Sequence, residues 1–265
     1  CRELGFDGVD INMGCPDRSI EKQGCGSAMI KTPDVAVAII DAAKRGAKSG
    51  EAGGIPVSVK TRLGYNEEAV DPWIVTLLEA APAALTVHCR TRKEMSKVPA
   101  RWERLVAIAE QRDQLSPDTK LIGNGDVLSL QDAHEKCEQY GVDGAMVGRA
   151  LFGNPWFFHP ERELPHKLLA LPTKGVNREE IVAEDTTNEA VEYISLEERL
   201  NVLLEHAALF EELLPFKNFN TMKKHVKGYV NGFPRAAELR AELMESDSAE
   251  AMRPFVHAFL ESTGA

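Results

Sequence analysis

The chain has 265 residues, of which 43% are hydrophobic and 27% are charged, a balance that excludes a disordered or fibrous protein. Its sequence contains no run approaching the roughly 18 consecutive apolar residues of a membrane-spanning helix, so we expect no membrane association. The formal net charge of -10 by itself argues against a nucleic-acid partner, because binding a phosphate backbone needs clustered Lys and Arg residues.

The negative charge is concentrated in one part of the sequence. Residues 161–214 carry thirteen Asp and Glu residues against five Lys and Arg residues. In contrast, segments 90–104 and 217–240 each contain six Lys and Arg residues, against two and one acidic residues respectively. Two local basic patches that could contact phosphate groups therefore exist within an acidic chain.

The cysteines indicate the redox environment of the protein. They are odd in number, widely spread and show no paired spacing for a metal, so we expect a reducing, cytoplasmic environment and no metal site. The sequence also begins without Met, and its first residues resemble the end of a helix that leads into a strand, so we expect further chain before Cys1. The five cysteines are Cys1, Cys15, Cys25, Cys89 and Cys137.

Short apolar segments alternate with stretches of helical periodicity in the first 150 residues. This alternation predicts βαβ units around a parallel sheet, hence an α/β fold. Thr32 followed by Pro33, and Ser129, provide helix-start signals between the strands. The predicted strands span residues 8–12, 56–61, 84–88, 120–124 and 144–148.

Polar residues follow each predicted strand, and this placement favours a (β/α)8 TIM barrel over an open sheet. In such a barrel the carboxyl ends of all strands meet at one mouth, where the active site lies. Five strands account for only about strands 4–8, so we expect three βα units upstream. Residues 1–158 are then the C-terminal portion of the barrel.

The remaining chain predicts two further regions. Residues 159–194 are acidic and rich in Pro, which indicates a linker or surface insertion. Ser195 and Glu198 have the spacing of a capping box at the start of a helical domain, residues 195–265. Its helices are predicted at 196–214, 220–229, 235–244 and 249–260.

The densest chemical signal is the loop after the first strand. Cys15 lies between Gly14 and Pro16, which would hold its thiol at the barrel mouth. A thiol is mostly protonated at neutral pH and is therefore suited to donating a proton. A lone cysteine buried in a tight turn is the commoner alternative.

Two further side chains and two glycine turns are placed near the same mouth. Lys60 ends an apolar strand, where it either meets an anion or extends to solvent at the barrel rim. His88 ends the next strand, as a functional or a core histidine. The turns at 123–126 and 144–149 follow the last two strands, the usual phosphate site of this architecture.

Together these motifs resemble the tRNA-dihydrouridine synthase family in both order and spacing. The resemblance runs from Gly5 to about Phe158 and resumes at 222–236, which is similar to the family's helical tRNA-binding domain. One departure is Cys89, where the family usually has glycine. The motifs are N-M-G-C-P at 12–16, G-C-G-S-A at 24–28, V-K-T-R-L-G at 59–64, V-H-C-R-T-R at 87–92, G-N-G-D-V at 123–127 and V-G-R-A-L-F-G-N-P-W at 147–156.

The resemblance implies an FMN-dependent enzyme that uses NADPH to reduce uridine in tRNA to 5,6-dihydrouridine. It further implies hydride transfer from flavin N5 to uracil C6, protonation of C5 by Cys15, and a base held by Asn12 after it leaves the tRNA fold. The implied FMN contacts are Lys60, His88, Asn124, Gly125, Asp126, Gly148 and Arg149. The implied tRNA phosphate contacts are Arg62, Arg90, Arg92, Lys223, Lys224 and Lys227.

Two other interpretations are compatible with the sequence. Another FMN barrel oxidoreductase, of the dihydroorotate dehydrogenase or old-yellow-enzyme type, would share the lysine and the phosphate site. A non-catalytic RNA-binding remnant would explain a partial barrel. The basic residues could also be ordinary solvated surface charges. The sequence does not determine the oligomeric state.

Overall fold

The computed structural model describes residues 1–48, 54–159, 162–163 and 192–263. The described residues form two compact units, residues 1–148 and the described residues from 149 onward, and each unit is considered by itself. Of the predicted acidic segment 159–194, most residues lie outside the described part of the chain.

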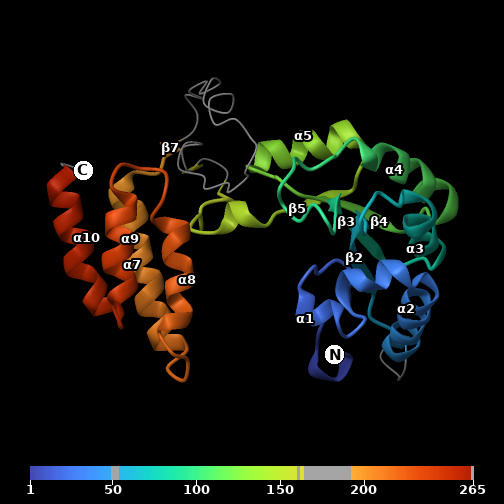
Figure 1. The fold of residues 1–265 in the computed structure, drawn as a ribbon, viewed down its shortest axis with the longest axis horizontal. Coiled ribbons are helices and arrows are strands. Elements are labelled where there is room, and N and C mark those ends of the chain that lie inside the picture. The colour runs from blue at the N-terminus through green and yellow to red at the C-terminus, as the bar shows by residue number, and fades with distance from the viewer. Residues whose placement is uncertain (49–53, 160–161, 164–191, 264–265) are drawn as a thin grey trace. The chain divides into compact units, whose positions relative to one another are not determined.

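The first unit is built on a five-stranded sheet in which every neighbouring pair is parallel and the strands are in sequence order (Figure 1). This confirms the predicted α/β class and all five predicted strands. The ends of β2 and β3 were predicted three residues too early, so Lys60 and His88 lie within strands. The strands are β1 (Val9–Asn12), β2 (Val57–Gly64), β3 (Ala84–Thr91), β4 (Lys120–Asn124) and β5 (Gly144–Met146).

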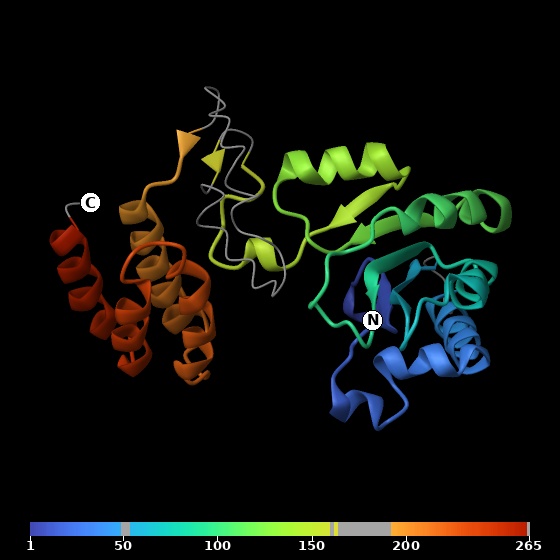
Figure 2. The same ribbon diagram turned by 45° about the horizontal axis from the view of Figure 1, so that its top comes forward.

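Helices α2, α3, α4 and α5 lie along one side of this sheet (Figures 1 and 2). The predicted start signals hold, since α2 begins at Pro33 and the Ser129 side chain accepts from the Asp132 N–H at the start of α5. The helices are α1 (Arg18–Glu21), α2 (Pro33–Lys48), α3 (Val75–Glu79), α4 (Arg104–Leu115) and α5 (Leu130–Tyr140). Shorter turns are η1 (Arg2–Leu4), η2 (Gly26–Lys31) and η3 (Val70–Ile74).

The two faces of the sheet differ in character. Val57 and Val59 on β2, and Leu85 and Val87 on β3, are buried, and they alternate with residues on the opposite face. The residues of that opposite face include Ser58, Lys60 and Arg62 of β2, Thr86, His88 and Arg90 of β3, and Asn124 of β4. One face therefore packs against the helices while the other presents polar side chains, as the inner face of a barrel mouth would.

The second unit contains a bundle of four helices. Ser195 accepts from the Glu198 N–H at the start of α7, which confirms the first half of the predicted capping box, whereas the Glu198 carboxylate pairs with Arg162 at 2.7 Å. Each helix contacts two others, and their apolar side chains form one core that includes Leu203, Val226, Leu239 and Val256. The elements are η4 (Arg149–Leu151), the short strands β6 (Arg162–Glu163) and β7 (Glu192–Tyr193), α7 (Leu196–Leu213), α8 (Asn220–Tyr229), α9 (Ala236–Glu245) and α10 (Ala249–Thr263).

Two glycines allow the chain after η4 to pass against α8. Gly153 has a φ of 71°, and a Cβ placed on it would lie 2.2 Å from the backbone carbon of Gly228. A Cβ on Gly228 would in turn lie 2.9 Å from the Gly153 nitrogen. Only glycine fits at this backbone contact.

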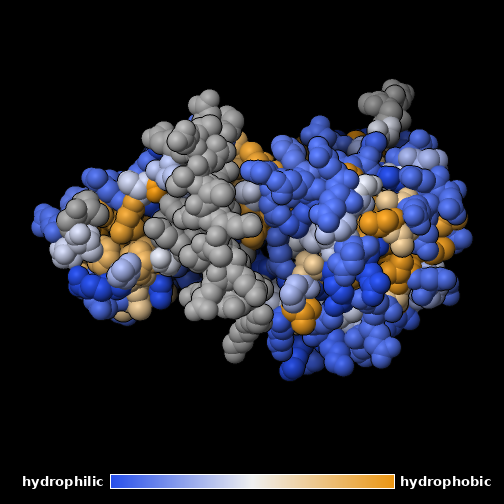
Figure 3. Space-filling view, turned by 90° about the horizontal axis from the view of Figure 1, so that it is seen from above, coloured by the Kyte–Doolittle hydropathy of each residue, from blue (hydrophilic) through white to orange (hydrophobic). Residues whose placement is uncertain are grey.

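The surface of the molecule is mostly hydrophilic on the face drawn in Figure 3, with smaller apolar patches between charged residues. None of the helices in the described part of the chain combines the length and the apolar character needed to cross a bilayer.

Candidate active site

The register of the sheet brings several predicted site residues together. Asn12 of β1 lies beside Lys60 of β2, and His88 of β3 lies between Arg62 of β2 and Asn124 of β4. Parallel strands in register therefore gather these side chains on one face of the sheet.

The Cys15 loop is fixed at both of its peptide groups. The Asn12 side-chain oxygen accepts from the N–H groups of Gly14 and Cys15, each at 3.0 Å. The Cys15 carbonyl accepts from the Ser27 N–H at 2.9 Å. Gly26, with a φ of 60°, is required behind the loop because a Cβ there would lie 2.7 Å from the Cys15 oxygen. The half-buried thiol is thus held on a stiff backbone.

Lys60 is a half-buried cation on β2, paired with Asn12 at the end of β1, the strand that leads into the Cys15 loop. Burial, and secondly the charge of Arg62, lower the pKa of Lys60 below its ordinary value. Within the described residues its ammonium makes no hydrogen bond or ion pair. A cation in this state is suited to receiving an anionic or strongly polar ligand atom.

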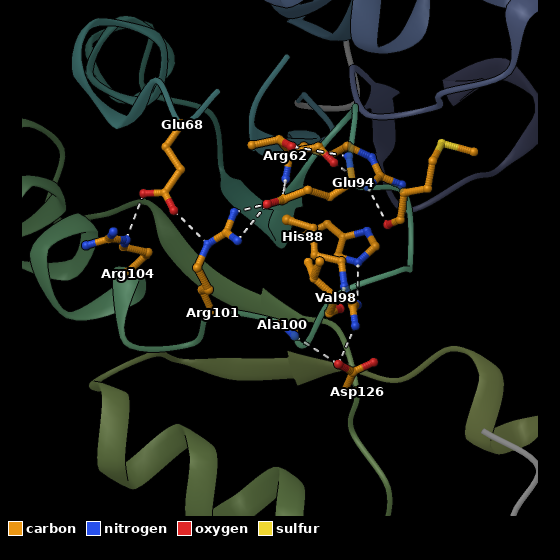
Figure 4. Close-up of polar contacts among 12 residues, drawn as sticks. Arg62, Glu68, His88, Glu94, Val98, Ala100, Arg101, Arg104 and Asp126 are labelled. Atoms are coloured by element: carbon orange, nitrogen blue, oxygen red, sulfur yellow. Dashed lines mark hydrogen bonds and ion pairs between the residues drawn. The ribbon is translucent and has the colours of Figure 1, made fainter. Parts of the chain in front are cut away.

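His88 and Asp126, which Figure 4 labels, are connected through Arg90. Arg90 pairs with the Asp126 carboxylate and also donates to His88 Nε2 at 3.2 Å. Because a guanidinium can only donate, His88 Nε2 acts as an acceptor. Asp126 also accepts from the Ala100 N–H at 2.9 Å. Gly125 has no room for a side chain, since a Cβ would lie 2.8 Å from that of Ala100.

The three predicted arginines have partners within the first unit. Arg62 donates to Gly14, Thr91 and Met95 carbonyls, and burial, then the charge of Arg90, lowers the pKa of Arg62 to about 10, which leaves it charged at neutral pH. Arg90 is 0% exposed. Arg62 and Arg90 lie within strands because β2 and β3 extend three residues further than predicted, and Arg62 contacts the Cys15 loop through the Gly14 carbonyl. A phosphate contact from either would require its guanidinium to leave these partners.

The surroundings of the remaining predicted cofactor residues, Asn124, Gly148 and Arg149, fix their role less closely. Asn124 donates its side-chain N–H to the Met146 carbonyl at 2.7 Å, which ties β4 to β5. Gly148 is exposed and a Cβ there would meet nothing within 4 Å, so the turn has open space beside it. Arg149 is half-buried in η4 and belongs to the second unit.

The predicted lysines of α8 divide into two kinds. Lys223 donates to the Met244 carbonyl at 2.7 Å, near the carboxyl end of α9. Lys224 and Lys227 are exposed, three residues apart and thus on the same side of the helix. Lys224 and Lys227 are thus the more exposed of the three lysines.

Sequence reasoning missed two residues beside Cys15. Ser27 and Glu21 are linked to each other and to the Cys15 loop. Ser27 lies within the motif at 24–28, which could have drawn attention to it, whereas no sequence signal marks Glu21. Cys89, in contrast, is buried, and this burial raises the pKa of its thiol to about 12, so that it is inert at neutral pH. No group of three or more potential metal ligands occurs among the described residues.

An ion-pair network braces the loops that follow β2 and β3 (Figure 4). Arg101 bridges Glu94, at 2.7 Å, and Glu68, at 2.6 Å, and Arg104 also pairs with Glu68 at 2.7 Å. The hydrogen bonds from Arg101 lower the pKa of Glu94 to about 2, even though partial burial acts to raise it.

This network predicts an acid-dependent loss of stability. Because the folded-state pKa of Glu94 lies below the ordinary value of 4.5, its contribution is full above pH 4.5 and is lost as the pH falls toward 2. We expect Glu94→Gln to be less stable than the parent protein at about pH 7 and the difference to shrink at about pH 3. Urea unfolding at both pH values measures this, and a pH-independent difference would contradict it.

Comparison with known proteins places the chain in a family. The family model described as dihydrouridine synthase (Dus) matches residues 1–263. A probable tRNA-dihydrouridine synthase of Staphylococcus aureus is 38% identical over 260 residues, which cover 97% of this chain and 68% of the relative. A probable tRNA-dihydrouridine synthase 2 of Bacillus subtilis is 38% identical over 258 residues, covering 97% of this chain and 69% of the relative.

These matches extend through both units and confirm the resemblance read from the sequence motifs. They favour this family over the dihydroorotate dehydrogenase and old-yellow-enzyme alternatives. The chain therefore belongs to the dihydrouridine synthase family and is an oxidoreductase.

Proposed function

We propose that this protein reduces uridine to 5,6-dihydrouridine in tRNA, with Cys15 as the proton donor. The observation that carries the proposal is the Cys15 loop, fixed by Asn12 and Ser27 beside a half-buried Lys60. The names of the relatives support tRNA as the substrate. All five cysteines are free, which suits a reducing compartment such as the cytoplasm.

We further propose that the sheet is part of a (β/α)8 barrel and that its polar face holds FMN. Lys60 supports this, because it is a half-buried cation whose pKa is lowered and which makes no internal pair within the described residues. Lys60 and His88 would contact the isoalloxazine ring. When bound, FMN would supply the hydride, and NADPH would return the flavin to its reduced form. The ribityl and phosphate contacts would come from Asn124, Gly125, Asp126, Gly148 and Arg149.

The chain's own residues complete the reduction. Cys15 donates a proton to uracil C5, and the stiff loop keeps the thiol oriented for that transfer. Asn12 uses its carbonyl oxygen to hold the loop, so its amide N–H₂ is the group left to hold the base. Reduction adds two hydrogens to the C5–C6 bond, and the second comes from Cys15.

The proposed function is tested by an anaerobic absorbance titration of the purified protein loaded with FMN. NADPH is expected to bleach the flavin bands, and undermodified tRNA is expected to restore them. Fully modified tRNA, in which the target uridine is already reduced, serves as the control. Flavin bands that stay bleached after both additions would contradict the proposal.

Lys60 provides a direct test of the cofactor site. Lys60→Met removes the cation from the polar face, so we expect FMN to bind about 10-fold more weakly or worse. Quenching of FMN fluorescence during titration measures the dissociation constant. Lys120→Met is the matched control. Lys120 is an exposed lysine at the first residue of β4, at the opposite end of that strand from Asn124, and it pairs with Asp143. Equal affinities for the two variants would remove Lys60 from the site.

We propose residues 1–158 as the barrel portion, 159–194 as a linker or insertion, and 195–265 as a helical tRNA-binding domain. Lys224 and Lys227 are the exposed cations of α8 that could meet phosphates. The tRNA contacts proposed for the barrel portion are fewer, because its arginines have internal partners. This leaves α8 as the best-defined basic surface for RNA.

The α8 surface is tested by changing Lys224 and Lys227 together to Gln. We expect weaker tRNA binding and a salt dependence of log Kd reduced by about 1–2 units of slope, since two phosphate contacts are lost. Filter binding at several salt concentrations measures both quantities. Lys223→Gln is the control, because Lys223 donates to the Met244 carbonyl. Unchanged binding by the double variant would exclude this surface.

A further inference from the structure

The Cys15 carbonyl lies against a buried serine. Ser27 is 0% exposed, and its N–H donates to the Cys15 carbonyl at 2.9 Å. Its hydroxyl lies 2.9 Å from the same carbonyl and 2.8 Å from Glu21 Oε1. One hydroxyl has a single proton, so the orientation of Ser27 depends on the state of Glu21.

Glu21 is a nearly buried carboxylate that is fully engaged. Its side chain is 9% exposed, and Arg92 pairs with both oxygens, with Nε at 2.9 Å from Oε1. Although burial acts to raise it, hydrogen bonds from Arg92, Ser27 and Tyr65 hold the pKa of Glu21 below its ordinary value. Glu21 is therefore a hydrogen-bond acceptor at neutral pH, and the Ser27 hydroxyl donates its hydrogen bond to Glu21 or divides it between Glu21 and the Cys15 carbonyl.

Arg92 connects this carboxylate to the sheet. Its N–H donates to the Gly64 carbonyl at the end of β2 at 2.9 Å. Its guanidinium also lies 5.2 Å from the centre of the Tyr65 ring, which Lys31 approaches to 4.3 Å. A continuous path of contacts thus runs from Cys15 through Ser27 and Glu21 to Arg92.

We propose that Glu21 and Arg92 are positioning residues that hold the Cys15 loop in place for proton donation to the uracil. This inference rests on the proposed function. Asn12 fixes the N–H of Cys15 and Ser27 fixes its carbonyl, and the Glu21–Arg92 pair locks Ser27 to the ends of β2 and β3. Small displacements of a reacting group are costly, about 100-fold for 1 Å. The pair also gives Arg92 a role other than the tRNA phosphate contact expected from the sequence.

The test compares Glu21→Ala, Arg92→Met and the double variant in single-turnover formation of dihydrouridine by NADPH-reduced protein at saturating tRNA. Each single variant is expected to be about 10- to 100-fold slower, and the double variant no slower than the worse single one, because both residues act through one link. The rate of flavin reduction by NADPH and the Kd for tRNA are expected to stay within about 2-fold.

Two further variants separate positioning from general stability. Glu21→Gln keeps a hydrogen-bond acceptor for Ser27 but loses the charge, so its rate should fall between those of the parent and Glu21→Ala. Arg112→Met breaks a partly buried pair with Asp143 at the other end of the sheet, and it should leave the single-turnover rate unchanged. Circular dichroism identifies any variant that fails to fold, and Glu21→Gln then provides the decisive comparison.

The outcomes distinguish this inference from the proposed function. A parent protein that forms no dihydrouridine would overturn the proposed function itself. A parent that is active, with Glu21→Ala or Glu21→Gln equally fast, would overturn the positioning role alone. A weaker tRNA affinity and a smaller salt dependence in Arg92→Met, with an unchanged rate in Glu21→Ala, would assign Arg92 to a phosphate contact instead and also overturn it.

Discussion

Replacement of Cys15 by Ala is expected to slow dihydrouridine formation by about 100- to 10,000-fold, because proton donation to the substrate is lost while the loop backbone stays in place. The hydrogen bonds that fix this loop come from the backbone of residue 15, and Ala retains them. FMN content, flavin reduction by NADPH and tRNA affinity should therefore remain near those of the parent.

Stopped-flow measurement of the two half-reactions checks this expectation. The step that uses NADPH should be unchanged and the step that uses tRNA should be slow. Cys25→Ala is the matched control, because this exposed thiol lies in the same region of the chain and we assign it no role. Undiminished product formation by Cys15→Ala would remove the thiol as proton donor.

Replacement of Gly153 by Ala is expected to destabilise the second unit by about 2–4 kcal/mol. Two effects add: the φ of 71° disfavours a side chain, and the new Cβ would lie 2.2 Å from the backbone of Gly228. Relief would require the chain after η4 to move away from α8. Thermal and urea unfolding followed by circular dichroism measure the loss.

Gly141→Ala separates these two effects. Gly141 has a similar φ of 66°, yet a Cβ there would meet nothing within 4 Å, so only the conformational cost of about 1 kcal/mol is expected. A Gly153→Ala variant that loses no more stability than Gly141→Ala would show that the backbone contact adjusts easily.

Much of the fold could be predicted because its signals are local. Apolar segments marked the five strands, and Ser129 and Ser195 marked helix starts that the structure shows as side-chain caps. The ends of β2 and β3 were missed because Arg62 and Arg90 read as the polar start of a loop. Their charges are instead satisfied by carbonyls and by Asp126 inside the unit.

The sequence named candidate site residues, but it did not indicate the contacts that connect them. The register that places Asn12 beside Lys60 comes from the pairing of β1 with β2, which the sequence did not specify. The pair between Glu21 and Arg92 joins residues 71 positions apart, and its two members sit in segments with no shared pattern. Such pairings depend on how α1 packs near the end of β3, which local sequence does not determine.

The central claim is that this protein makes dihydrouridine in tRNA, and nucleoside mass spectrometry tests it most directly. Protein loaded with FMN is incubated with NADPH and undermodified tRNA, and the digested RNA is analysed beside a sample without NADPH. We predict uridine that is heavier by two hydrogens only in the complete reaction. Bound tRNA without any such product would contradict the claim and favour an RNA-binding protein that lacks catalytic activity.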